Sequence, residues 1–204
     1  MFSVRSTAVA LSVVALVLGT GLPTSAADID GTAGDDVLLG TAAGDRIRGQ
    51  AGDDVIDSGA GADRVYGGSG DDELFLGANP LLEGPSGDLG FGGAGDDLVV
   101  GGPGFDILVG NVGDDTLVGG TGDNTYEDRA GRDVVLGGPD GDVVYLGEGR
   151  DTVRLGGAPD AVFVGVDGRR DLIWCGPGVD HVYRGDALDP RDRFFGCERF
   201  AAGP

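Results

Sequence analysis

The chain has 204 residues and a formal net charge of −21, and all of its basic residues are arginines. This length suits one domain with a continuous core and is short for two. Because the arginines are scattered along so acidic a chain, the composition argues against nucleic acid as a partner. Such a chain either stays expanded or gathers cations.

Residues 1–27 have the pattern of a secretory signal peptide. Arg5 precedes a largely apolar run over residues 8–18, and Pro23 and small residues follow up to Ala26 and Ala27. The apolar run is shorter than the roughly 20 residues that cross a bilayer, which favours cleavage over an uncleaved membrane anchor. No later segment is long and apolar enough to span a membrane. We therefore expect a secreted, extracellular protein without a membrane span in its mature form.

A nine-residue period begins at Gly31. Five rows follow one another up to Phe75, and they read GTAGDDVLL, GTAAGDRIR, GQAGDDVID, SGAGADRVY and GGSGDDELF. An insertion of seven residues, 76–82, interrupts the phase, and a degenerate row, EGPSGDLGF, then leads into further rows that end at Phe163. After two extra residues within 164–170, the last row, CGPGVDHVY, starts at Cys175.

Two places of the row define the pattern. The sixth place is aspartate in every row except one, which has Asn124, and the eighth place is apolar in every row except one, which has Gly90. Composition alone does not lock two residue classes to one period, two places apart, so the repeat is structural. The locked apolar place also argues against acidic, glycine-rich disorder.

Each row combines a glycine-rich turn with a very short strand. Side chains alternate across a strand, so the eighth place faces one side of it while the seventh and ninth face the other. One row cannot bury its single apolar side chain, but rows stacked about 4.8 Å apart form a continuous apolar column and pair their backbones. The period therefore predicts an all-β solenoid of parallel strands.

The rows GGSGDDELF, GGAGDDLVV and GGPGFDILV match the nonapeptide G-G-x-G-x-D-x-U-x, with U apolar, at every defined place. In this the chain resembles the haemolysin-type calcium-binding repeat proteins, or RTX proteins, over about residues 31–163. The resemblance implies a parallel β-roll, a right-handed β-solenoid in which two rows make one turn. Typical RTX toxins carry a C-terminal export signal and no N-terminal one, so toxin-type secretion is not expected here.

The resemblance also implies several Ca²⁺ ions in the turns between rows. Sixth-place carboxylates and backbone carbonyls of the glycine-rich loops would hold these ions, and oxygen atoms are the ligands that Ca²⁺ prefers. The expected metal ligands are Asp36, Asp45, Asp54, Asp63, Asp72, Asp97, Asp106, Asp115, Asp133, Asp142, Asp151 and Asp160. Neighbouring carboxylates stacked about 5 Å apart would repel by on the order of 3 kcal/mol at an effective dielectric near 20. We therefore expect calcium binding and folding to be one equilibrium, with fewer ions than rows because degenerate and terminal rows bind poorly.

Residues 164–204 are expected to form degenerate repeats and a C-terminal cap on a roll that spans residues 28–163. The cysteines, Cys175 and Cys197, are expected to form a disulfide after export. Apolar residues around them, such as Trp174 and Phe200, suit a cover for the open end of the solenoid. The segment CGPGVDHVY…CERF resembles the end of some secreted bacterial proteins of this repeat class.

No catalytic site is expected. The single histidine, His181, lies in the seventh place of a row, where exposure to solvent is expected, and the repeat accounts for the carboxylates. The first hypothesis is a calcium-binding protein with a structural or surface role. The alternative is an accessory module of a secreted enzyme system or an adhesin that binds a cell surface or extracellular polysaccharide through its outer face. A disordered calcium buffer would not need the locked apolar place.

Overall fold

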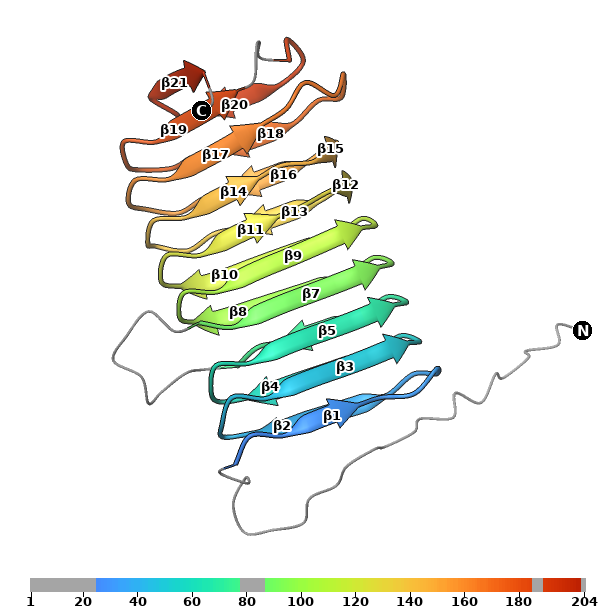
Figure 1. The fold of residues 1–204 in the computed structure, drawn as a ribbon. Helices are drawn as coiled ribbons and strands as arrows, with labels where there is room; N and C mark the ends of the chain where they lie inside the picture. Colours follow the sequence, from blue (N-terminus) through green and yellow to red (C-terminus); the bar gives the residue numbers. More distant parts are fainter. Residues whose placement is uncertain (1–24, 78–86, 185–188, 203–204) are drawn as a thin grey trace, which may run out of the picture.

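The computed structural model describes residues 25–77, 87–184 and 189–202, which coil into a solenoid of β-strands (Figure 1). Residues 1–24 of the expected signal peptide and residues 78–82 of the expected insertion lie outside this part of the chain. The described residues include no helix, and hence none that could cross a membrane. The predicted all-β parallel solenoid is confirmed.

Two parallel sheets form the walls of the solenoid. The twelve-stranded sheet contains β1 (Asp28–Asp30), β3 (Arg46–Ala51), β5 (Arg64–Ser69), β7 (Leu89–Ala94), β9 (Ile107–Val112), β11 (Thr125–Glu127), β12 (Ala130–Gly131), β14 (Val143–Tyr145), β15 (Glu148–Gly149), β17 (Ala161–Val164), β19 (His181–Arg184) and β21 (Arg199–Ala202). The nine-stranded sheet contains β2 (Val37–Thr41), β4 (Val55–Gly59), β6 (Glu73–Phe75), β8 (Leu98–Pro103), β10 (Thr116–Thr121), β13 (Val134–Leu136), β16 (Thr152–Arg154), β18 (Leu172–Trp174) and β20 (Arg193–Phe195).

Two rows make one turn of the coil. Each strand pairs in parallel with the strand one turn later, as β3 does with β5, where Ile47 lies beside Val65. Equivalent residues of successive turns are 18 apart in sequence in most of the coil, but 25 apart between Asp63 and Asp88. The seven extra residues therefore leave the register of the strands on either side unchanged.

The core is the predicted column of eighth-place side chains between the two sheets. Leu38, Ile56, Val99 and the other apolar eighth-place residues are fully buried. At the exception, Gly90, a Cβ atom would lie 2.8 Å from Val99 Cγ1 and 2.9 Å from Leu76 Cδ1. Leu76 is the first residue of the expected insertion, and it fills the space that a side chain at position 90 would have taken.

The backbone of the loops divides the roll into two halves. We call residues 28–127 the N-terminal half and residues 128–202 the C-terminal half. Positive φ angles occur at the second and fourth places of every described row that begins between Gly49 and Gly119, for example at Gly68 (127°) and Gly70 (124°). In the C-terminal half these places do not follow this rule, although single residues there, such as Ala158, have positive φ.

The C-terminal half contains a disulfide and stacked aromatic rings. A disulfide joins Cys175 to Cys197, whose Cα atoms are 5.2 Å apart. Trp174 on β18 stacks on Phe195 on β20 at 4.8 Å between ring centroids, and the Arg154 guanidinium lies over the Trp174 ring. The expected disulfide is therefore present, and the aromatic residues near it pair between turns.

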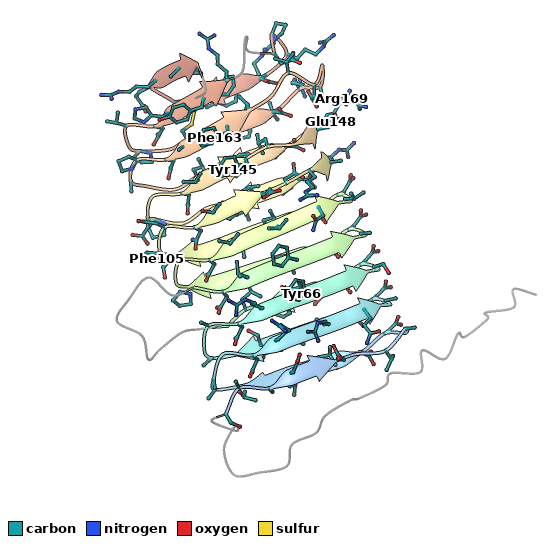
Figure 2. All side chains as sticks on the ribbon, in the orientation of Figure 1. Tyr66, Phe105, Tyr145, Glu148, Phe163 and Arg169 are labelled. Carbon is teal, nitrogen blue, oxygen red and sulfur yellow. A yellow bond between two sulfur atoms is a disulfide. The ribbon has the colours of Figure 1, made fainter. Side chains whose placement is uncertain are left out.

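A row of aromatic rings also lies on the outer face of the twelve-stranded sheet. Tyr145 and Phe163, both labelled in Figure 2, stack on each other, and Phe163 also stacks on Tyr183, with 4.7 Å between ring centroids in both pairs. His181, the single histidine, lies half-buried on the same face and stacks on Tyr183, with its Nε2 atom 3.4 Å from the Arg199 guanidinium. The rings follow the strand spacing, so each stabilises the stacking of the next turn.

Candidate metal sites

The sixth-place residues form two hydrogen-bonded columns, one along each edge of the roll. The backbone N–H of each residue donates to a side-chain oxygen of the next residue in its column, as Asp54 does to Asp72 Oδ1 at 2.8 Å. The Asp54 column contains Asp36, Asp54, Asp72, Asp97, Asp115, Asp133, Asp151, Asp171 and Asp192. The Asp63 column contains Asp45, Asp63, Asp88, Asp106, Asn124, Asp142, Asp160 and Asp180 and ends at Glu198.

All twelve aspartates expected to bind metal lie in these columns, and each is at least nine-tenths buried. Asp88, Asp171 and Asp180, which the sequence places in weaker or terminal rows, are buried in the same way. Alternation of rows between the two edges accounts for the two columns. The predicted stacking of carboxylates is therefore present along both edges.

Most of these carboxylates use only one of their two oxygens. The Oδ2 atom is buried and has no hydrogen-bond partner among the described residues in Asp54, Asp63, Asp72, Asp88, Asp97, Asp106, Asp115, Asp133, Asp151, Asp160, Asp180 and Asp192. Asp36, Asp45 and Asp142 differ. Their Oδ2 atoms accept hydrogen bonds from the backbone N–H groups of Thr32, Thr41 and Gly138, respectively. A buried carboxylate oxygen without a partner is costly, and a bound cation removes that cost.

Glycine at the first place keeps open the space into which these oxygens point. A Cβ atom on Gly101 would lie 2.5 Å from Asp106 Oδ2 and 2.7 Å from the Gly119 carbonyl oxygen. A carboxylate oxygen and a backbone carbonyl oxygen of the next turn therefore converge on a space that a Cβ atom at position 101 would enter. These hard oxygen donors fit Ca²⁺, which takes six to eight oxygen ligands in flexible geometry.

Burial makes the carboxylates of the columns hard to ionise without a cation. Desolvation raises the pKa of Asp72 to about 6 and the pKa of Asp97 and Asp115 to about 7. Hydrogen bonds from backbone N–H groups lower these pKa values, and the negative charges of neighbouring aspartates raise them further. A divalent cation would favour the ionised form because it places positive charge beside it.

The Asn124 row has lost its carboxylate and also the open space beside it. Asn124 keeps its place in the column, since its Oδ1 accepts the Asp106 N–H at 2.9 Å, but its Nδ2 donates to the Gly122 carbonyl. The hydroxyl of Tyr126, the eighth-place residue, lies where a Cβ atom on Gly119 would be. An amide and a hydroxyl therefore occupy a space that other rows leave to carboxylate and carbonyl oxygens.

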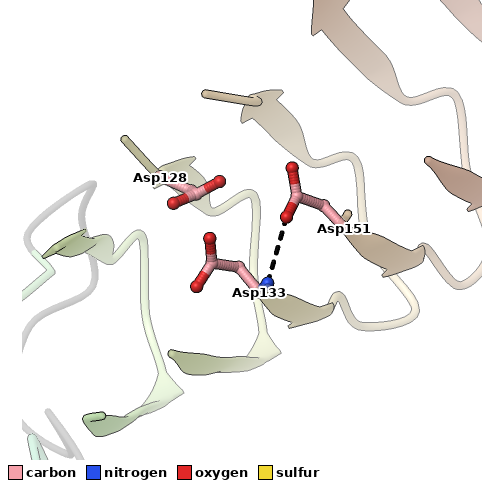
Figure 3. A group of neighbouring side chains, drawn as sticks. All are labelled: Asp128, Asp133 and Asp151. Carbon is pink, nitrogen blue, oxygen red and sulfur yellow. Dashed lines mark hydrogen bonds between the residues drawn. The ribbon is translucent and has the colours of Figure 1, made fainter. Parts of the chain in front are cut away.

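Asp128 is a candidate ligand that the sequence analysis did not identify. It occupies the first place of the row DRAGRDVVL, where most rows have glycine, and its side chain is buried. Oxygen atoms of Asp128, Asp133 and Asp151 lie within 4.8 Å of one another (Figure 3). The only signal in the sequence is an acidic residue in a place where most rows have glycine.

The family model of the RTX calcium-binding nonapeptide repeat matches residues 30–65, 39–74, 91–126 and 118–153. Together these matches cover more than half of the chain. No curated protein matches the chain. Repeats of this kind bind Ca²⁺, in agreement with the oxygen donors that the two columns gather.

Proposed function

This chain belongs to the family of RTX calcium-binding nonapeptide repeat proteins, and from that premise we propose that it is a secreted protein that folds when its two aspartate columns bind calcium. The observation that carries the proposal is the row of buried Oδ2 atoms without partners along both edges. A fold that buries so many carboxylates with unpartnered oxygens needs cations to keep them ionised. Bound calcium supplies that positive charge.

We assign the ligand role to the sixth-place carboxylates, together with carbonyl oxygens of the glycine-rich loops. The proposed ligands are Asp36, Asp45, Asp54, Asp63, Asp72, Asp97, Asp106, Asp115, Asp133, Asp142, Asp151 and Asp160. We expect the number of bound ions to be smaller than the number of rows. The Asn124 row supports this, because an amide and the Tyr126 hydroxyl fill the space where an ion would bind.

Export and folding are linked in this proposal. Residues 1–27 act as the signal peptide, residues 28–163 form the calcium-binding roll, and residues 164–204 form the cap. Extracellular calcium modules typically bind at about 10⁻⁴ to 10⁻³ M, so the chain stays unfolded in a cytosol low in calcium and folds outside. The Cys175–Cys197 disulfide supports this, because disulfides persist in oxidising compartments.

Circular dichroism of the exported chain, with and without a calcium chelator, tests the proposal. Most of the strand signal should be lost on chelation and return when calcium is added, and calorimetry should record the uptake of several ions. Magnesium should not replace calcium, since it requires stricter octahedral geometry and loses its water reluctantly. Unchanged strand content in the chelator would contradict the proposal.

The role that we assign is structural or at a surface, without catalysis, as is typical of this repeat family. A second candidate is the binding of extracellular polysaccharide through the outer face of the twelve-stranded sheet. The aromatic row of Tyr145, Phe163 and Tyr183 favours it, and Tyr145 is 44% exposed. Sugars bind to the faces of aromatic rings, however, and the faces in this row are largely covered by one another.

Sedimentation with insoluble polysaccharides separates the two roles. If the second candidate is correct, calcium-loaded protein should sediment with the polymer, and Tyr145→Ala should release it. If the wild-type protein and Tyr145→Ala both stay in the supernatant, the polysaccharide-binding role is wrong and the structural role remains.

A further inference from the structure

The junction between the two halves of the roll contains a group of acidic side chains that the repeat pattern does not require. We propose that Asp128, Asp133 and Asp151 together bind one calcium ion, and that this ion binds first and most tightly. The inference rests on the proposed calcium-binding function. It goes further in naming a ligand outside the sixth place and an order of filling.

The side chains of this group are fully enclosed. The exposed fraction is 4% for Asp128, 0% for Asp133 and 1% for Asp151. Asp128 Oδ1, Asp133 Oδ2 and Asp151 Oδ2 all lack hydrogen-bond partners among the described residues. Each of these buried carboxylates has an unpartnered oxygen, and the three residues bring carboxylate oxygens within 4.8 Å of one another, which suits a cation (Figure 3).

The remaining oxygens of the group are occupied, so the free ones have a fixed direction. Asp133 Oδ1 accepts the Asp115 N–H at 2.6 Å, and Asp151 Oδ1 accepts the Asp133 N–H at 3.0 Å. Asp128 Oδ2 accepts a longer hydrogen bond from the Gly147 N–H at 3.4 Å. The backbone therefore orients the carboxylates while one oxygen of each remains for an ion.

Arginine does not neutralise the group. Arg132 and Arg150 are the neighbours of Asp133 and Asp151 in sequence, but no salt bridge within 4.0 Å joins them to any of the three carboxylates in the described structure. Both guanidinium groups are exposed and line a groove of about 640 Å³ on the outside of this edge, together with Arg169. The positive charge near the group is thus turned toward solvent.

The third carboxylate distinguishes this site from the others. A consensus loop offers carboxylates of two neighbouring turns and carbonyl oxygens, whereas this loop adds Asp128 in the place of glycine. The affinity of calcium sites rises with the number of charged ligands. The site should therefore retain its ion at calcium concentrations at which the glycine-rich loops are empty.

Three variants of the full exported chain test the proposal. Asp128→Asn removes the charge and keeps the shape, and Asp128→Gly restores the residue found at the first place of most rows. Glu148→Gln is the matched control, because Glu148 is exposed on the next turn of the same edge and its loss changes the net charge equally. Each protein is folded in millimolar calcium, checked by circular dichroism, and desalted into micromolar free calcium.

Bound calcium is then counted by elemental analysis, and binding is followed by calorimetry. The wild-type protein and Glu148→Gln should retain about one ion per chain, and both Asp128 variants should retain none. The tightest phase of the isotherm should weaken by at least about tenfold in these variants, while the weaker phases stay in place.

The inference fails if the wild-type protein retains no ion at micromolar calcium, if the Asp128 variants retain as much as the wild type, or if Glu148→Gln loses it too. If Asp128→Asn does not fold in millimolar calcium, Asp128→Gly decides the outcome. A wild-type protein that takes up no calcium at any concentration would instead overturn the proposed function itself.

Discussion

The two halves of the roll share one period but rely on different interactions. In the N-terminal half, most strands have five or six residues, and the loops from Gly49 onward repeat the same pair of positive φ angles. In the C-terminal half, the strands have two to four residues, and a disulfide and most of the stacked aromatic pairs are found there.

The fifth place of the Asp54 edge changes between the halves in the same way. Asp35, Asp53, Asp71, Asp96 and Asp114 occupy it in the N-terminal half, and each of the last four donates its N–H to the aspartate before it. Arg132 continues this outer ladder by donating to Asp114, but it has the opposite charge. The outer ladder is therefore acidic in the N-terminal half and reaches an arginine in the C-terminal half, where the disulfide and most of the stacked aromatic pairs lie.

Removal of calcium should have the largest effect and should separate the halves. In a chelator, the amides of residues 28–127 should lose their protection from hydrogen exchange, because most of their acidic charge is stacked without another source of positive charge. The amides near the disulfide should retain more protection. Hydrogen exchange followed by mass spectrometry measures the protection in each half. If both halves lose protection equally, they do not differ in their dependence on calcium.

Acid should replace calcium in part. The pKa of Asp72 is raised to about 6 in the folded chain and that of Asp97 and Asp115 to about 7, whereas aspartate in an unfolded chain titrates near 3.9. The stabilisation from protonating these groups is complete below about pH 4 and is lost as the pH rises through about 6 to 7. In a chelator, strand content should therefore increase from pH 8 to pH 5.

The apparent calcium affinity should decrease as the pH falls, since protons and calcium compete for the same carboxylates. Calcium titrations followed by circular dichroism at several pH values measure it. If the calcium affinity is unchanged at pH values below about 6, these carboxylates are not the ligands.

Loss of the disulfide should affect mainly the C-terminal half. Replacing Cys175 and Cys197 by alanine opens a loop with a sequence separation of 22, which should lower the free energy of unfolding by about 3 kcal/mol. Denaturation in saturating calcium measures the change. Calcium binding by the sites in the N-terminal half should stay the same. A large change in the number of ions bound or in their affinity would mean that the two halves are coupled.

Gly101→Ala should have a smaller effect, confined to one site. Its Cβ would meet Asp106 Oδ2 and the Gly119 carbonyl oxygen, so calorimetry should detect the loss of about one ion and of about 2 kcal/mol of stability at saturating calcium. Gly34→Ala is the matched control, because a Cβ there meets nothing within 4 Å. Its effect should be within about 0.5 kcal/mol, and equal effects of the two substitutions would argue against a cradle at Gly101.

Much of this architecture follows from the period alone. A residue locked to the eighth place must be buried when rows stack, and a residue locked to the sixth place must form a column at an edge. The columns that begin at Asp36 and Asp45 and the core column were predictable for this reason. The pairing of Cys175 with Cys197 was predictable because the chain has no other cysteine.

Side chains that depart from the period were not predictable in the same way. Leu76 fills the space above Gly90, and the Tyr126 hydroxyl reaches the space beside Gly119, but neither contact follows from spacing along the chain. Asp128 looks like the loss of a glycine until the coil brings Asp133 and Asp151 beside it. Such departures acquire a role only through the turn above or below.

The insertion between Gly77 and Gly87 shows that the strand pairing does not depend on the number of residues in a turn. Arg64 pairs with Leu89 as regularly as Arg46 pairs with Arg64, and the Asp63 N–H still donates to Asp88 Oδ1 at 2.7 Å, although more chain separates them. Foreign peptides of varied length could therefore be inserted between Gly77 and Gly87 for display, and the strand pairing on either side should stay the same.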